Sequence, residues 1–233
     1  MSSRVAVVSG GNRGLGLEIV RQLADRGLRV VLGSRSLAAG LAAADSLGQP
    51  PAEIIAAELD ITDPGSVTAF AAWLHGRFRR CDVLINNAAI AVDGVQDAAT
   101  ANLELVRRTL ETNLMGAWHL TQVLIPAMRA RRYGRIVNMS SGVGGLNRME
   151  GGIPAYRVSK AALNALTRIF ADELHDDNIL VNACCPGHVQ TVMGGPSAGV
   201  PVTLAADTPV WLATLPPDGC TGGFYRNREP IEW

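Results

Sequence analysis

Residues 4–16 read RVAVVSGGNRGLG, an apolar run followed directly by a turn that holds four glycines. The apolar run predicts a buried strand over residues 4–8, and residues 14–26 predict a helix that ends at Gly27. Glycines let a backbone turn tightly and approach a pyrophosphate, and the start of the next helix offers free amide donors. This strand–turn–helix therefore predicts a dinucleotide-binding site near the start of the chain.

The same alternation of apolar strand and helix continues along the whole chain. Such alternation is typical of βαβ units, which form a parallel sheet with helices on both faces. We therefore expect an α/β fold, a single doubly wound Rossmann-type domain over residues 1–233, with a seven-stranded and mostly parallel sheet. The expected strands are residues 4–8, 29–33, 52–59, 82–85, 135–139, 179–184 and 222–225, and the expected helices are 14–26, 37–47, 64–79, 103–129, 154–175 and 205–215.

Composition narrows the class of protein. Hydrophobic residues make up 48% of the 233 residues, which is enough for a full core. Lysine plus arginine and aspartate plus glutamate number 21 each, and this balance argues against binding to nucleic acid or to an acidic membrane. The four cysteines lack metal-ligand spacing, so no metal is expected. Neither a signal peptide nor a membrane-length apolar run is evident, which predicts a cytoplasmic protein.

Polar residues follow most of the expected strands. The carboxyl ends of parallel strands share one edge of the sheet, and ligands bind outside that edge. The sequence therefore predicts one site there, built from residues 9–12, 34–35, 60, 86–87, 140–141 and 186–191.

The end of the second strand indicates which dinucleotide is bound. An NAD site usually has an acidic residue there, hydrogen-bonded to the ribose hydroxyls. Here Gly33, Ser34 and Arg35 occupy the place, and no acid occurs between Asp25 and Asp45. A guanidinium binds a 2′-phosphate well, and Arg13 in the glycine turn offers a second one. The sequence therefore favours NADP(H) over NAD(H).

Tyr156 and Lys160 stand four residues apart in an expected helix, so their side chains share one face. A free phenol has a pKa of about 10, and a cation held close to it lowers that pKa toward neutrality. The pair thus suits a proton donor and acceptor. Two ordinary helix residues also occur at this spacing, so the interpretation depends on the other motifs.

Taken together, these motifs resemble the short-chain dehydrogenase/reductase family along nearly the whole chain, and its carbonyl-reductase-like members in particular. Two departures are mild: Ser9 replaces a threonine, and Ala89 replaces a glycine beside the cofactor. The matching motifs are Ser9–Gly16, Asp60, Asn86-Asn87-Ala88-Ala89, Asn113, Ser140-Ser141, Tyr156-x-x-x-Lys160, Pro186-Gly187-His188-Val189-Gln190-Thr191 and the 211–216 stretch WLATLP.

The resemblance implies a catalytic set of Asn113, Ser141, Tyr156 and Lys160. Tyr156 would give a proton to a carbonyl oxygen, and Lys160 would lower the phenol's pKa and hold the nicotinamide ribose. Ser141 would hold the substrate oxygen, and Asn113 a water near Lys160. The cofactor-binding residues implied are Gly10, Asn12, Arg13, Gly14, Leu15, Gly16, Ser34, Arg35, Asp60, Ile61, Asn87, Ala88, Ala89, Tyr156, Lys160, Pro186, Gly187, Val189 and Thr191.

The expected reaction is NADP(H)-dependent reduction of a ketone or aldehyde to an alcohol, or the reverse. The loops at 90–95, 143–153 and 188–200 are mixed apolar and small, which suits an apolar small-molecule substrate. His188 is expected to line the site or to be solvated. An epimerase or lyase with the same Tyr–Lys pair, and a non-catalytic NADP(H) sensor, remain alternatives. The resemblance also implies a homodimer or homotetramer.

Overall fold

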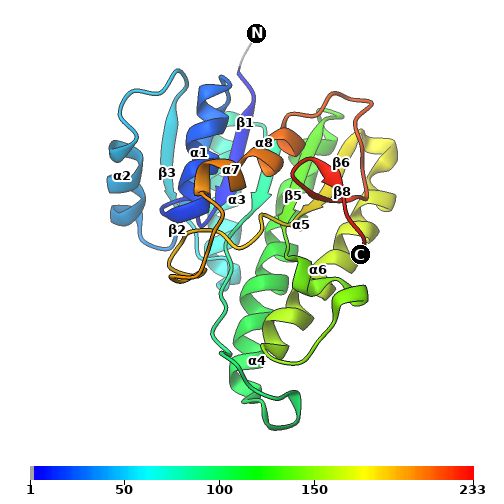
Figure 1. The fold of residues 1–233 in the computed structure, drawn as a ribbon. Helices are drawn as coiled ribbons and strands as arrows, with labels where there is room; N and C mark the ends of the chain where they lie inside the picture. The colour runs from blue at the N-terminus through cyan, green and yellow to red at the C-terminus, as the bar shows by residue number, and fades with distance from the viewer. Residues whose placement is uncertain (1–2) are drawn as a thin grey trace.

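The fold is an α/β layer structure with one sheet, in a computed structural model that describes residues 3–233. Figure 1 shows the sheet between two layers of helices, and its strand order is β3-β2-β1-β4-β5-β6-β7-β8. The first seven strands are parallel, and β8 is antiparallel to β7. The strands are β1 (Val5–Ser9), β2 (Arg29–Ser34), β3 (Ile54–Glu58), β4 (Val83–Asn86), β5 (Gly134–Met139), β6 (Ile179–Cys184), β7 (Phe224–Arg226) and β8 (Glu229–Pro230).

Helices cover both faces of this sheet. One face carries α1 (Gly14–Asp25), α2 (Leu37–Ser46), α7 (Val202–Ala205) and α8 (Asp207–Ala213). The other carries α3 (Pro64–Phe78), α5 (Ala117–Arg129) and α6 (Pro154–Glu173), and α4 (Leu103–Leu110) packs against α6 beyond the sheet edge. Short 3-10 turns are η1 (Ala98–Thr100), η3 (Gly142–Gly144), η4 (Leu146–Arg148) and η5 (His175–Asp177).

The core forms two layers because the central strands are buried on both sides. Along β1, Val5 and Val7 pack toward α3, α5 and α6, whereas Ala6 and Val8 pack toward α1 and α8. A strand buried on both faces needs apolar residues at every position, which explains the continuous apolar runs in the sequence. The predicted α/β fold with its parallel sheet is thus confirmed.

The eighth strand was not expected from the sequence. It forms a two-residue hairpin with β7, through Asn227 and Arg228, whose φ angles are 54° and 62°. Two central residues at positive φ match the twist that a tight hairpin requires. The strand is only two residues long, and its sequence has no alternating pattern that would reveal it.

The expected helix over residues 103–129 is interrupted. A π-helical turn, η2 (Glu111–Gly116), separates α4 from α5, and Asn113 lies within it. Such turns widen the helix by one residue and occur often at functional sites. The expected helix over residues 205–215 is the shorter α8, and a separate short helix, α7, precedes it. Hydrophobic periodicity does not report such breaks, because a one-residue insertion leaves the apolar pattern nearly unchanged.

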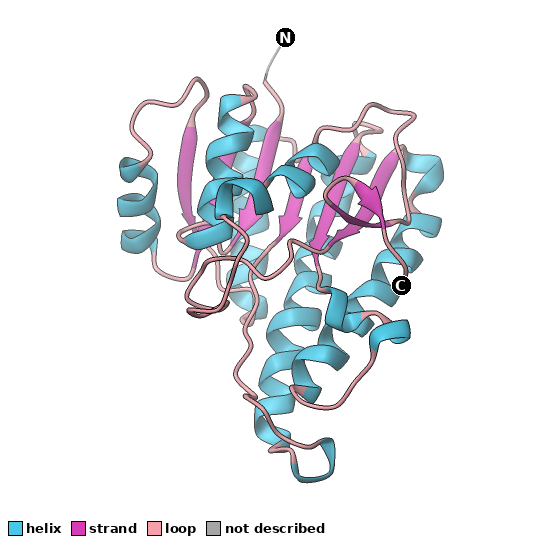
Figure 2. Cartoon of the chain, viewed as in Figure 1, coloured by secondary structure: helices cyan, strands magenta, loops and turns pink. Residues whose placement is uncertain are grey.

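All the parallel strands point their carboxyl ends toward one edge of the sheet. Figure 2 shows the arrowheads directed toward the edge from which α4 and the first turns of α6 extend. Loops from distant parts of the sequence therefore meet there. Within residues 3–233, the structure contains no helix with the length and apolar character needed to cross a bilayer.

Candidate active site

Tyr156 and Lys160 lie in the first two turns of α6, at the carboxyl edge of the sheet. Pro154 occupies the first helical position, where its missing N–H is not needed. The Lys160 Nζ atom lies 5.5 Å from the centre of the Tyr156 ring. Lys160 is the only lysine in the chain, and its side chain is almost fully buried. The spacing in the sequence therefore translates into a close pair.

The ammonium of Lys160 is fixed by β5. Its Nζ atom donates a hydrogen bond of 2.7 Å to the Met139 carbonyl oxygen at the end of that strand. Burial lowers the pKa of Lys160 to about 8, because desolvation disfavours the charged form. The group therefore changes protonation close to neutral pH.

The phenol of Tyr156 behaves differently from the sequence-based expectation. Burial raises its pKa to about 12; the nearby Cys185 and Asp93 act in the same direction, and a hydrogen bond with Ser141 acts in the opposite one. The predicted lowering of this pKa by Lys160 is not found; desolvation of the phenol, which disfavours the charged form, is the largest effect. The phenol is therefore protonated at neutral pH and available as a proton donor.

The two adjacent serines after β5 point to different partners. Ser141 interacts with the Tyr156 phenol, and its Oγ also accepts a bond from the Val143 amide. Ser140 is buried, and its Oγ donates a 2.6 Å hydrogen bond to the Asn164 side chain. Only Ser141 therefore shares the space of Tyr156. Its catalytic role stays a prediction.

Alanine substitutions can distinguish the roles of the Ser140 and Ser141 hydroxyls. We expect Ser141→Ala to lower kcat by about 10²-fold, because an aligned donor to a reacting oxygen has that order of effect. Ser140→Ala should leave kcat nearly unchanged and lower the free energy of unfolding by about 1–3 kcal/mol, because the buried Asn164 loses a partner. Steady-state kinetics and urea unfolding of both variants measure these effects. The reverse pattern would assign the reacting serine to position 140.

Asn113 connects the loop after β4 to α6. Its side chain accepts a hydrogen bond from the Ile90 amide and donates one to the Ile90 carbonyl, both at 2.8 Å. It also donates to the Ser159 Oγ atom at 3.0 Å, and Ser159 donates to the Tyr156 carbonyl. Asn113 therefore lies against the loop after β4 and against the first turns of α6. Its holding of a water near Lys160 stays a prediction.

The glycine turn fits an anionic diphosphate. Arg13 precedes α1 without a side-chain cap, and no acid occupies the first turn, so the first amides of α1 have no capping side chain. Gly10 and Gly14 have φ angles of 62° and 53°, which favour glycine. A Cβ atom on Gly16 would collide with the Gly10 carbonyl oxygen. A phosphate group can bind at a helix start of this kind, because the amides are free and the glycines have no side chains that would block its approach.

The loop after β4 is held against the glycine turn. Ser9 Oγ accepts hydrogen bonds from the amides of Asn87 and Ala88, each at 3.1 Å. The Asn87 side chain donates to the carbonyls of Ser9 and Gly10. The Ser9 hydroxyl, which a threonine would also provide, therefore holds this loop in place. Ala89 follows in the same loop and is half-buried, as are Asn12 and Leu15 in the glycine turn.

The adenosine end of the predicted site lies along β2 and β3. The guanidinium groups of Arg13 and Arg35 are exposed, and neither forms a hydrogen bond or ion pair with any residue in the described range 3–233. Ser34 is buried next to Arg35. Asp60 Oδ1 accepts bonds from the Thr62 amide and hydroxyl, and Ile61 is buried under Gly116. Free cations after β2, at Arg35, and in the glycine turn, at Arg13, leave this region suited to a phosphate.

The loop after β6 returns to the glycine turn. Gly187 has a φ of 82°, and Val189 forms an isolated bridge with Val200. A Cβ atom on Gly14 would lie 3.2 Å from the Thr191 methyl group, so Thr191 packs against the phosphate end of the site. Pro186 leads this loop out of β6. His188 is exposed to solvent. Its Nε2 atom forms a 2.8 Å hydrogen bond with the Gly194 carbonyl.

Sequence patterns missed two groups beside Tyr156. Asp93 is buried, and its Oδ2 atom accepts a 2.9 Å hydrogen bond from the Ala155 amide. The Cys185 Sγ atom accepts one from the Gly142 amide at 3.2 Å. Both contacts join residues more than 40 positions apart in the sequence, and no motif spacing reports them.

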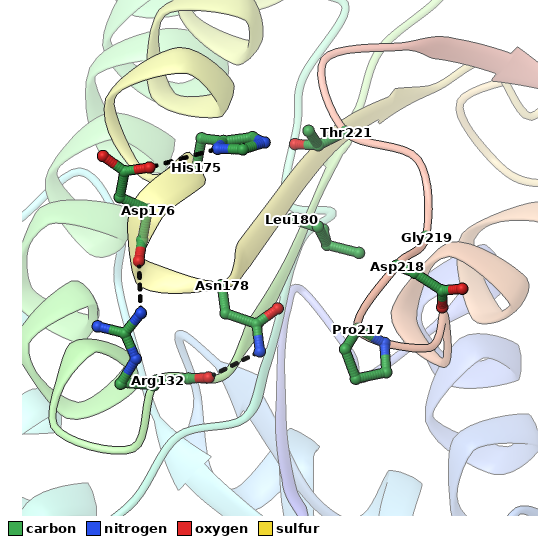
Figure 3. Close-up of a pocket in the computed structure, with 9 residues that line it drawn as sticks. All are labelled: Arg132, His175, Asp176, Asn178, Leu180, Pro217, Asp218, Gly219 and Thr221. Atoms are coloured by element: carbon green, nitrogen blue, oxygen red, sulfur yellow. Dashed lines mark hydrogen bonds and ion pairs between the residues drawn. The ribbon is translucent and has the colours of Figure 1, made fainter.

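A hollow of about 350 Å³ lies at the opposite edge of the sheet (Figure 3). It opens at the amino ends of β5 and β6, among Arg132, Asn178 and Leu180, and the Arg132 carbonyl accepts a bond from the Asn178 side chain there. Tyr156 and the glycine turn are not among its lining residues. The candidate site therefore remains at the carboxyl edge.

Comparison with known proteins agrees with this geometry. The family model described as short chain dehydrogenase matches residues 4–198. Carbonyl reductase [NADPH] 1 of Sus scrofa is 34% identical, over 100% of this chain and 95% of its own length. (+)-Neomenthol dehydrogenase of Arabidopsis thaliana is 32% identical, over 98% of this chain and 97% of its own length.

A solved structure shares the same fold. Salutaridine reductase from Papaver somniferum superimposes with a TM-score of 0.85 at 28% identity, covering 95% of this chain and 99% of its own. The predicted resemblance is thereby confirmed, since the family match, the relatives and the fold agree. The chain belongs to the short-chain dehydrogenase/reductase family of oxidoreductases and is similar to its carbonyl reductases.

Proposed function

We propose that this oxidoreductase interconverts a ketone or aldehyde and its alcohol with NADP(H). The observation that carries the proposal is the placement of Tyr156, Lys160 and Ser141 at the same edge of the sheet as the uncapped start of α1. A protonated phenol and a hydroxyl in contact can together bind one carbonyl oxygen. The glycine turn would hold the cofactor next to them.

Each side chain would have a separate role in the proposed reduction. Ser141 would donate a hydrogen bond to the carbonyl oxygen, and Tyr156 would transfer its phenolic proton to that oxygen as the C–O bond becomes single. The bound nicotinamide would supply the hydride to the carbonyl carbon. Lys160 would hold the nicotinamide ribose and, with its pKa lowered to about 8, would help to return a proton to the phenolate. The alcohol would then carry the hydride from the nicotinamide on its carbon and the proton from Tyr156 on its oxygen.

The proposed preference for NADP(H) depends on charge at the end of β2. Arg35 and Arg13 are exposed and uncompensated within the described chain, and Ser34 replaces the usual acid. Mammalian relatives carry NADPH in their names, which supports the same cofactor here. A 2′-phosphate would receive charge-assisted hydrogen bonds from these guanidinium groups.

Arg35→Asp is expected to reverse this preference. Loss of a charge-assisted hydrogen bond is worth about 1.5–3 kcal/mol, and repulsion adds to it, so kcat/KM for NADPH should fall by about 10²-fold. Steady-state kinetics with NADPH and NADH measure the ratio. Arg131→Asp makes the same charge change at an exposed turn after α5 and should leave the ratio unaltered. An unchanged ratio in Arg35→Asp would refute the charge argument.

The substrate proposed is an apolar small molecule. The three loops around Tyr156 expose apolar side chains, and this favours an apolar ketone over a charged one. The exposed large apolar residues that belong to these loops are Val92, Val95, Leu146, Met149, Val192 and Met193.

We also propose a homodimer or homotetramer. Large apolar side chains stand exposed on the helices that the resemblance places between subunits, and such a patch favours association. These side chains are Leu103 on α4, Met115 and Trp118 around the start of α5, and Val158 and Ile169 on α6.

A further inference from the structure

The helix that carries Tyr156 begins without a cap of its own. Its N-cap residue is Ile153, which forms no side-chain hydrogen bond and has a φ of 41°. A β-branched residue at positive φ is strained, so the surroundings must hold it there. The first turn of α6 also lacks an acidic residue. The free amides of this turn therefore need a partner from elsewhere in the chain.

Asp93 provides that partner from the loop after β4. Its Oδ2 atom accepts hydrogen bonds from the amides of Ala155, at 2.9 Å, and Tyr156, at 3.2 Å. The side chain is 6% exposed. A carboxylate at a helix N-terminus satisfies amide donors and interacts favourably with the helix dipole. One of the amides it binds belongs to the proposed proton donor itself.

The negative charge of Asp93 is not neutralised by a neighbouring cation. Its Oδ1 atom is buried without a hydrogen-bond partner, and no ion pair joins it to a cationic side chain among residues 3–233. The groups that face the Tyr156 phenol are Lys160 from its own helix, Ser141 after β5, Cys185 after β6 and this carboxylate. The charge of Asp93 therefore disfavours the phenolate.

The segment that carries Asp93 is itself anchored to α6. The Asn113 side chain forms hydrogen bonds with both the amide and the carbonyl of Ile90. It also donates to the Ser159 hydroxyl, which donates to the Tyr156 carbonyl. Tyr156 is thus held at its amide by Asp93 and at its carbonyl by the Asn113–Ser159 pair. Asp93 and the residue that Asn113 binds, Ile90, belong to the same short stretch of the loop after β4.

We infer that Asp93 is a positioning residue for Tyr156, which fixes the backbone of the first turn of α6 and places a fixed negative charge beside the phenol. The inference rests on the proposed function, in which Tyr156 is the proton donor. In this arrangement the carboxylate keeps the hydrogen on the phenol until a substrate oxygen receives it. The same residue aligns that hydrogen with the Ser141 hydroxyl.

The ionisation of Tyr156 tests the inference without any substrate. Tyrosinate absorbance at pH 11, measured against the matching Tyr156→Phe protein, isolates Tyr156 from Tyr133 and Tyr225. With a pKa of about 12, roughly a tenth of Tyr156 is ionised at that pH in the unaltered protein. In Asp93→Asn, which keeps an acceptor oxygen but loses the charge, the ionised fraction should rise about threefold or more.

Turnover provides the second readout. Asp93→Ala should lower kcat by about tenfold and leave the KM for NADPH within about twofold, because the helix start loses its cap. Asp93→Asn should recover most of kcat at neutral pH, since an amide oxygen still accepts from the two backbone amides.

Asp63 offers a matched control. It caps α3 by accepting a 2.9 Å hydrogen bond from the Gly65 amide. Asp63→Ala should lower the Tm without changing the ionisation of Tyr156 or kcat. The inference is overturned if Asp93→Asn leaves the ionised fraction unchanged, or if Asp93→Ala lowers only the Tm, as Asp63→Ala does. Failure of every carbonyl to turn over would instead count against the proposed function, while the shift in Tyr156 ionisation would still support the role of Asp93.

Discussion

Replacement of Tyr156 by phenylalanine is expected to lower kcat by about 10³-fold, because the proton donor is lost while the ring remains. The Kd for NADPH should change by less than about twofold, since the glycine turn and Arg35 are untouched. Steady-state kinetics with a reactive carbonyl compound give kcat, and quenching of protein fluorescence gives the Kd.

Tyr133 supplies the control for this change. Its hydroxyl is buried without a hydrogen-bond partner, and its ring lies between the guanidinium groups of Arg4 and Arg135, away from the site. Tyr133→Phe should therefore retain full activity. A Tyr156→Phe protein that keeps more than about a tenth of the turnover would remove Tyr156 from the proposed role of acid.

Lys160→Met should abolish turnover and yet stabilise the protein at pH 7. Burial lowers the pKa of Lys160 to about 8 from an ordinary 10.5, so the folded state bears the full penalty of a buried charge below pH 8. Between pH 8 and 10.5 the unfolded chain binds the proton and the folded chain does not, so the stability of the unaltered protein rises relative to the variant. The advantage of the variant, about 1–3 kcal/mol at pH 7, should shrink across that window.

Urea unfolding of both proteins at pH 7 and pH 10 measures this difference. No other lysine titrates, because Lys160 is the only lysine in the sequence. A variant that is less stable at pH 7, or whose difference from the unaltered protein does not depend on pH, would show that the ammonium is not penalised in the fold.

The sequence predicted the features that depend on neighbouring residues. The turn at Gly10–Gly16, the pair at Tyr156 and Lys160, and the cation at Arg35 are each set by local spacing, and the structure places them at one edge. The parallel sheet could be predicted for the same reason, since each βαβ unit is formed by consecutive residues. All these features can therefore be identified from the sequence alone.

Other features arise only from packing and could not be predicted. Asp93 caps a helix that begins 61 positions later in the chain, and the π-helical turn at Asn113 leaves no mark on the apolar pattern. The raised pKa of Tyr156 has the same origin. The spacing of Lys160 predicted a lowered pKa, whereas the main cause of the shift is burial of the phenol, to which Cys185 and Asp93 add from other loops.

In the proposed reaction, hydride moves between the cofactor and a carbonyl carbon. The most direct measurement is a single turnover with NADPH that carries deuterium at the transferred position of its nicotinamide, followed by mass spectrometry of the product. Carbonyl reduction should yield one equivalent of NADP⁺ and an alcohol with one deuterium on its carbinol carbon. Conversion of the substrate with no net consumption of NADPH, or a product without deuterium, would rule out carbonyl reduction and favour an epimerase or lyase with the same Tyr–Lys pair.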